Sequence, residues 1–154
     1  MMTSTFSIFV NLVFNISNEL FFKDIFVGQK ENFSIKITES MLDEFANLSG
    51  DFNPLHMDNE FAGSSPFKKR IVHGMLLASF FSQLVGMKLP GKNALYFSQT
   101  LNFRSPCYID DEIQVVGEVI DKSDSTKIIT ISISIFNESK ICLIDGIAKV
   151  IVRK

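Results

Sequence analysis

The sequence predicts an α+β fold in which an antiparallel sheet wraps around one buried helix. Between residues 75 and 85 apolar side chains cover nearly every side, so a helix there must be buried over most of its circumference. Strand-like runs rich in β-branched residues follow it, separated by short polar turns. Because strands follow strands without intervening helices, the sheet is expected to be antiparallel.

The first half of the chain supplies one further strand and one further helix. Apolar residues alternate over residues 33–37, which predicts a strand. Thr38 is a good N-cap and Gly50 a good stop signal, so we expect a helix between them. Its apolar face consists of Met41, Leu42, Phe45 and Leu48. Residues 51–70 follow no period and predict loops or short turns. The later strand-like runs are residues 93–105, 111–122, 126–136 and 140–152.

Composition narrows the functional classes. The chain has 154 residues, 46% of them hydrophobic, which suits a single globular domain with an ample core. The net charge of −2 provides no basic field for a phosphate backbone, so nucleic-acid binding is not expected. Cys107 and Cys142 lack metal-type spacing and are expected to be reduced, as in a cytoplasmic protein.

The sequence predicts an N-terminal extension that precedes the domain. We expect residues 1–24 to be an extension of uncertain order and residues 25–154 to be one domain. The extension has no basic residue before Lys23, so the basic region of a signal peptide is absent, and its interrupted apolar run is too short to span a bilayer. An additional strand, a poorly ordered arm and a non-standard export signal remain as alternatives.

The stretch "LSGDFNPLHMD" is the strongest candidate site. Asp51 follows a helix end, and Pro54 fixes a turn that Asn53 can hold with its side-chain amide. Such a turn can point the Asp51 carboxylate and the His56 imidazole into one cleft. A carboxylate and an imidazole that share a water molecule suit general acid–base catalysis near neutral pH.

Two other interpretations of this stretch stay open at the level of the residues. An Asp-x-Asn-Pro sequence also ends helices, and a lone histidine is often a structural residue. A metal site would use His56, Asp58 and His73, but these residues lack a standard ligand spacing, so no metal is expected.

Two segments together resemble the MaoC-like (R)-specific enoyl-CoA hydratase family, also called hydratase 2. The first segment matches the family signature at Ser49–Asp51, Asn53–His56 and Asp58. The second is Ile71–Met75, which matches the segment that enters the central helix. The resemblance extends from about Phe26 to the C-terminus and implies a "hot dog" fold, a sheet wrapped around one long helix.

The resemblance also implies a reaction and the residues that perform it. The reaction is reversible syn addition of water to a trans-2-enoyl-CoA, giving the (R)-3-hydroxyacyl-CoA. Asp51 and His56 would activate the water, and the backbone N–H of Gly74 would stabilise the enolate oxygen. Ser82 would hydrogen-bond the Asp51 carboxylate, as its counterpart does in relatives. Acyl-CoA is then a substrate and no cofactor is needed.

For several residues a structural role competes with the functional one. Gly74 could be a simple helix-entry turn, Ser82 could bond back to its own helix, and His73 is expected to orient the turn at the helix mouth. Phe80, Phe81, Leu84 and Val85 could line an acyl tunnel or form core. The basic run Lys68–Arg70 could meet CoA phosphates or be solvated.

The sequence is also compatible with two other functions, and it predicts a homodimer. A 3-hydroxyacyl-ACP dehydratase would perform the same chemistry on a carrier-protein thioester. A non-catalytic hot dog module would bind acyl thioesters, but it would have no use for a water-activating pair. Because sheet edges are normally paired or covered, a homodimer with a continuous sheet is expected.

Overall fold

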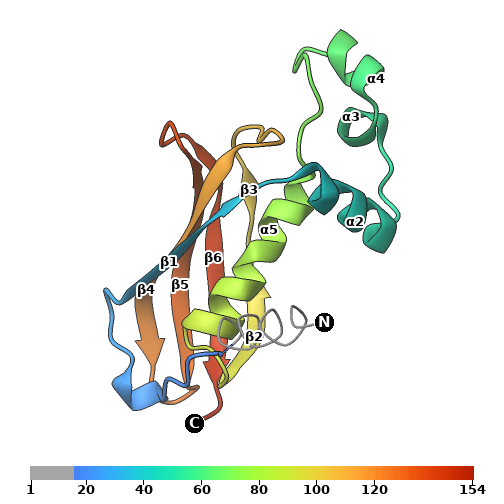
Figure 1. Cartoon of the computed structure of the whole chain (residues 1–154). Coiled ribbons are helices and arrows are strands. Elements are labelled where there is room, and N and C mark those ends of the chain that lie inside the picture. The colour runs from blue at the N-terminus through green and yellow to red at the C-terminus, as the bar shows by residue number, and fades with distance from the viewer. Residues whose placement is uncertain (1–15) are drawn as a thin grey trace, which may run out of the picture.

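The structure, a computed structural model, describes residues 16–154. A six-stranded antiparallel sheet curves along one helix, α5 (Gly74–Gln83), as Figure 1 shows. The strand order is β1-β4-β5-β6-β2, and the short β3 also pairs with β6. The strands are β1 (Lys30–Lys36), β2 (Ala94–Gln99), β3 (Asn102–Phe103), β4 (Glu112–Ser123), β5 (Ile128–Asn137) and β6 (Cys142–Val152). The predicted sheet around a single helix is confirmed.

Alternation along the central strands builds the core. In β5 four isoleucines are fully buried and alternate with threonine and serine, which point to the opposite face. This period of two places one apolar row against α5 and leaves the other sheet face polar. The buried isoleucines are Ile129, Ile131, Ile133 and Ile135.

The predicted strand at residues 93–105 is two strands, β2 and β3. Between them the chain pairs with β6 through Thr100, whose N–H donates to the Ile147 carbonyl at 2.9 Å. The backbone passes so close to β6 that a Cβ on Gly146 would lie 1.9 Å from the Thr100 carbonyl oxygen. The break therefore depends on a glycine some 45 residues later in the chain, which the local pattern does not reveal.

The helix α2 (Glu39–Ser49) begins and ends as predicted. The Thr38 hydroxyl accepts a hydrogen bond from Met41 N–H at 3.3 Å, and Gly50 ends the helix with φ +79°. The sequence pattern places Leu48 on the apolar face, and this prediction is wrong, because Leu48 is 86% exposed. Leu42 and Ala46 are the buried residues of this helix.

The long apolar segment forms α5 and then a π-helical turn, η2 (Leu84–Lys88). Leu76, Leu77 and Phe81 face the sheet and are buried. In the single chain the opposite side of α5 is exposed, with Met75 58% accessible, so burial does not extend around the whole helix. Three helices, α2, α3 (Pro54–Met57) and α4 (Asn59–Ser64), lie near the N-terminus of α5 (Figure 1). The sequence does not predict α3 and α4 as helices, because each is too short to show a helical period.

Residues 16–25 pack against the domain. Asn18 N–H donates to the Met87 carbonyl at 2.8 Å, and the side chains of Phe22 and Ile25 are buried. The Lys122 ammonium donates to the carbonyls of both these residues. Of the expected extension, residues 1–15 lie outside the described part of the chain. No helix in residues 16–154 combines the length and apolarity needed to cross a membrane.

Candidate active site

The turn after α2 positions Asp51. Its carboxylate accepts a hydrogen bond from Asn53 N–H at 3.1 Å, and the Asn53 side chain in turn accepts from Leu55 N–H at 2.9 Å. Asn53 is therefore the N-cap of α3, with Pro54 at the first helical position. Two consecutive side-chain hydrogen bonds shape this turn locally, and one long-range bond, to His73, reaches the Asp51 carbonyl.

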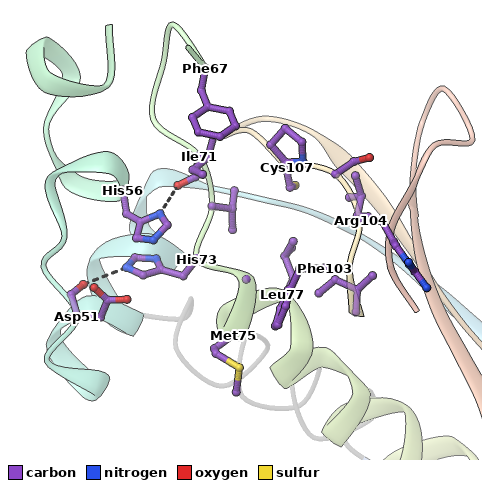
Figure 2. Close-up of a pocket in the computed structure, with 16 residues that line it drawn as sticks. Asp51, His56, Phe67, Ile71, His73, Met75, Leu77, Phe103, Arg104 and Cys107 are labelled. Carbon is purple, nitrogen blue, oxygen red and sulfur yellow. Dashed lines mark hydrogen bonds between the residues drawn. The ribbon is translucent and has the colours of Figure 1, made fainter. Parts of the chain in front are cut away.

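The short helix α3 carries His56, which is half-buried. Its Nδ1 lies 2.8 Å from the Ile71 carbonyl oxygen, a hydrogen bond visible in Figure 2. Because a carbonyl can only accept, Nδ1 carries the proton in the neutral ring. The Nε2 atom then presents a lone pair, which is the form that a general base requires.

His73 lies next to the His56 ring and is 1% exposed. Its Nε2–H donates to the Asp51 carbonyl oxygen at 3.0 Å, and its ring centroid is 4.1 Å from that of His56. Burial lowers the pKa of His73 below its ordinary value, so the ring is neutral at pH 7. His73 thus orients the turn that carries Asp51, the structural role expected for it.

The three side chains converge. Asp51, His56 and His73 each offer one polar atom, and these atoms lie within 4.8 Å of one another. The predicted approach of the acid to the imidazole is therefore found. Asp58, offered for a metal site from the sequence, instead accepts from Phe61 N–H at 2.9 Å and caps α4.

Gly74 begins α5 directly after His73. The first N–H groups of a helix have no partner within the helix, and its dipole favours negative charge there. A Cβ on Gly74 would lie 2.7 Å from Cε1 of Phe103, which stands over the helix start. Because glycine has no side chain, another group can come close to the backbone at the start of α5. In this structure that group is the Phe103 ring.

These residues line one cavity of about 500 Å³. Asp51, His56, His73 and Gly74 form a polar side, while the remaining lining is largely apolar. The apolar lining includes Phe67, Val72, Leu77, Phe103, Cys107, Leu143 and Ile144, several of which appear in Figure 2. A polar pair beside an apolar wall suits a ligand with a reactive polar end and a hydrocarbon part.

The sheet contributes residues that the sequence analysis missed. Phe103, Cys107 and Leu143 follow or lie within strands, and no local motif singles them out as pocket residues. Burial raises the pKa of the Cys107 thiol to about 12, so it stays protonated and adds only apolar surface.

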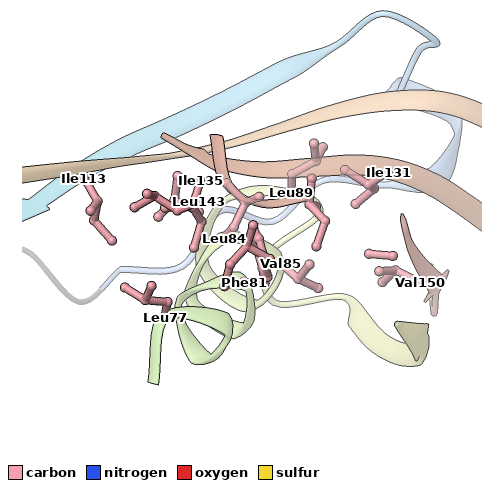
Figure 3. Close-up of a cluster of buried hydrophobic side chains, with 14 of the residues drawn as sticks. Leu77, Phe81, Leu84, Val85, Leu89, Ile113, Ile131, Ile135, Leu143 and Val150 are labelled. Atoms are coloured by element: carbon pink, nitrogen blue, oxygen red, sulfur yellow. The ribbon is translucent and has the colours of Figure 1, made fainter. Parts of the chain in front are cut away.

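Below the cavity the core is filled. Phe81, Leu84 and Val85 pack among the sheet residues that Figure 3 shows and are at most 1% exposed. The sequence allows either a tunnel or a core role for Phe80 and for these three residues. In the single chain the three belong to the core, and Phe80 is partly buried against it. Leu77 and Leu143 belong both to the cavity lining and to this cluster, so they form its floor.

Two expectations for polar residues need correction. Within the single chain Ser82 makes no hydrogen bond with Asp51: it lies eight positions after Gly74, about 12 Å along the helix axis, and it lines a different groove with Phe45 and Tyr96. Arg70 is neither solvated nor placed at a mouth for phosphates, because its side chain is only 6% exposed. Lys68 and Lys69 are exposed.

A family model described as a MaoC-like domain matches residues 25–137. The chain belongs to the MaoC-like family. The (R)-specific enoyl-CoA hydratase of Aeromonas caviae is 42% identical to this MaoC-like chain over 124 residues, covering 80% of the chain and 92% of that protein. A protein of the same name from Rhodospirillum rubrum is 37% identical over 132 residues, which cover 86% of this chain and 91% of that protein. A mitochondrial 3-hydroxyacyl-[acyl-carrier-protein] dehydratase from Arabidopsis thaliana is 41% identical over 110 residues, which cover 70% of this chain and 65% of that protein.

Solved structures agree with this MaoC-like fold. The Aeromonas caviae (R)-hydratase superposes with a TM-score of 0.81 at 41% identity, covering 83% of this chain and 97% of that one. The unliganded R-hydratase PhaJ1 of Pseudomonas aeruginosa gives a TM-score of 0.85 at 33% identity, covering 90% of this chain and 88% of that one. The hot dog fold implied by the sequence resemblance is thereby confirmed.

Proposed function

We propose that this chain catalyses the reversible hydration of trans-2-enoyl-CoA to (R)-3-hydroxyacyl-CoA, as a hydro-lyase of fatty-acid metabolism. The observation that carries the proposal is the convergence of Asp51 and His56 beside Gly74 in an apolar cavity. The similarity to two proteins named (R)-specific enoyl-CoA hydratase supports the choice of substrate.

The chemistry requires three tasks, and the site offers a group for each. A water held between the Asp51 carboxylate and His56 Nε2 loses a proton as its oxygen adds to C3 of the enoyl group. A proton from the same pair reaches C2 from the same face, which makes the addition syn. The Gly74 N–H stabilises the enolate charge on the thioester oxygen. The removal and the delivery of the proton are not divided between Asp51 and His56, because both side chains reach the same water.

Crotonyl-CoA hydration, followed by loss of the enoyl absorbance, tests the proposal. Asp51→Asn and His56→Ala should each lower kcat by about 10²–10⁴-fold, the usual contribution of general acid–base catalysis. The matched control is Asp124→Asn, which removes an exposed carboxylate in the β4–β5 turn. A near-wild-type rate in either site variant, or no wild-type turnover on any enoyl-CoA, contradicts the assignment.

The acyl carrier distinguishes the second candidate function. The Arabidopsis relative is named for a carrier-protein thioester, so a 3-hydroxyacyl-ACP dehydratase shares the same site chemistry. Comparing kcat/KM for the CoA and carrier-protein thioesters of one acyl group separates the two. A wild-type protein that binds acyl-CoA without turnover would instead be the non-catalytic module.

We also propose a cytoplasmic homodimer that works without a cofactor. β2 is an edge strand of the sheet, and it carries three consecutive exposed apolar residues, Leu95, Tyr96 and Phe97. An exposed apolar edge favours pairing with a second copy, which would extend the sheet. Light scattering on the purified protein tests this, and a monomer at micromolar concentration would contradict it.

A further inference from the structure

Arg70 carries a charged group into the domain. Its guanidinium is 6% exposed, whereas the neighbouring Lys68 and Lys69 are exposed. A buried charge is costly unless it is paired and hydrogen-bonded, so its partners indicate what it does.

The guanidinium joins the first turn of α2 to α3. Its Nη1 donates to Glu39 Oε1 at 2.6 Å, and Nε donates to the His56 carbonyl oxygen at 2.5 Å. Asp43 Oδ1 is 3.9 Å from Nη2, an ion pair without a hydrogen bond. One planar group therefore ties the backbone of His56 to the acidic side of α2.

The residue after Arg70 holds the same histidine from the other end. The Ile71 carbonyl accepts the His56 Nδ1–H at 2.8 Å, and Ile71 N–H donates to the Leu55 carbonyl at 3.3 Å. His56 is thus held at its main chain by Arg70 and at its ring by Ile71. The chain then runs through His73 to Gly74, so the segment that holds the imidazole also leads to the helix N–H.

We propose that Arg70 is a positioning residue of the hydratase site, which anchors α3 to α2 and so places the His56 imidazole. This inference rests on the proposed function. It excludes a role for Arg70 in binding CoA phosphates, because the guanidinium is enclosed and already engaged. Displacements of about 1 Å at a catalytic group can cost about 10²-fold in rate, so loss of the anchor should appear in kcat.

The variants Arg70→Met and Arg70→Lys test the inference, with Lys69→Met as the matched control. Arg70→Met should lower kcat about 10- to 100-fold with KM for crotonyl-CoA nearly unchanged. Arg70→Lys keeps the charge and one donor and should recover part of the rate. Lys69→Met should leave kcat at the wild-type value. A raised KM with normal kcat would indicate substrate contact, and normal kcat with only a lower urea midpoint would indicate a merely structural group; either result overturns the proposal.

A double-mutant cycle identifies the anchor. Glu39→Gln weakens the second end of the link without touching the histidine. If Arg70 acts through Glu39, this variant should lower kcat less than Arg70→Met does, and the double variant should be no slower than Arg70→Met alone. Fully additive losses would mean that the two residues act independently, which contradicts the proposed anchor.

The imidazole spectrum gives a readout that does not depend on turnover. The chain has only two histidines, so a long-range ¹H–¹⁵N spectrum contains two rings. Arg70→Met or, where it fails to fold, Arg70→Lys should shift or broaden the His56 signals, whereas Lys69→Met should not. Unchanged His56 signals overturn the positioning role even if the protein is active. Shifted signals without wild-type turnover would overturn the hydratase assignment and, with it, the catalytic part of this inference.

Discussion

Replacing Gly74 by alanine separates two reasons for a glycine at the start of α5. The added Cβ would lie 2.7 Å from Phe103 Cε1 and 2.8 Å from Cδ1. Unstrained carbon atoms lie about 3.5–4.0 Å apart, so the ring must move by about 1 Å. Phe103 is 55% exposed and can turn toward solvent. Alanine also favours a helix over glycine by up to about 1 kcal/mol, so the free energy of unfolding should change by less than about 1 kcal/mol.

The effect on catalysis should be much larger. The methyl group would occupy the space beside the Gly74 N–H where the thioester oxygen must approach. Loss of one oxyanion donor costs about 10²–10³-fold in kcat in other enzymes, and we expect a similar loss here. The measurement pairs crotonyl-CoA turnover with urea unfolding, so that a slow enzyme can be distinguished from an unfolded one.

Phe103→Ala supplies the control. If the methyl group itself excludes the thioester, Gly74→Ala should remain slow when Phe103 is also replaced by alanine. If the double variant regains the wild-type rate, the displaced ring caused the loss. That result, or a Gly74→Ala enzyme with normal kcat, would refute the placement of the enolate oxygen at this N–H.

Two other predictions concern stability. Phe22→Ala should lower the free energy of unfolding by about 3–5 kcal/mol, because its buried ring fills a core site beneath Lys122 and Lys127. The control is Phe26→Ala, which removes an exposed ring and should change the free energy of unfolding little. Equal urea midpoints for the two variants would show that this segment does not stabilise the domain. The folded-state pKa of His73 lies below its ordinary value of 6.5. Below about pH 6.5 the unfolded chain therefore binds a proton at His73 that the folded chain does not yet bind. The free energy of unfolding should then fall as the pH falls. His73→Asn should weaken this dependence when urea midpoints at pH 7.5 and pH 5.5 are compared, and an equal drop in both proteins would contradict the explanation.

The longer elements and the central turn could be predicted from the sequence because neighbouring residues decide them, whereas the short helices α3 and α4 could not. Thr38 and Gly50 bound α2 through contacts within four residues, and Asn53 caps α3 through a bond to a residue two positions away. The alternating isoleucines of β5 determine which face is buried wherever the strand lies. These local signals sufficed to identify the fold class and to place Asp51 and His56 on one turn.

Only the tertiary structure decided what surrounds that turn. The His56 ring is held by a carbonyl 15 residues away, and the space in front of Gly74 is set by Phe103 on the sheet. A basic run such as Lys68–Arg70 gives no sign that its last member turns inward, since only the packing of α2 and α3 provides partners for it. Likewise, the pattern of α5 does not show that Ser82 faces a different groove from Asp51. Periodicity assigns residues to faces, but contacts between distant segments determine what each face meets.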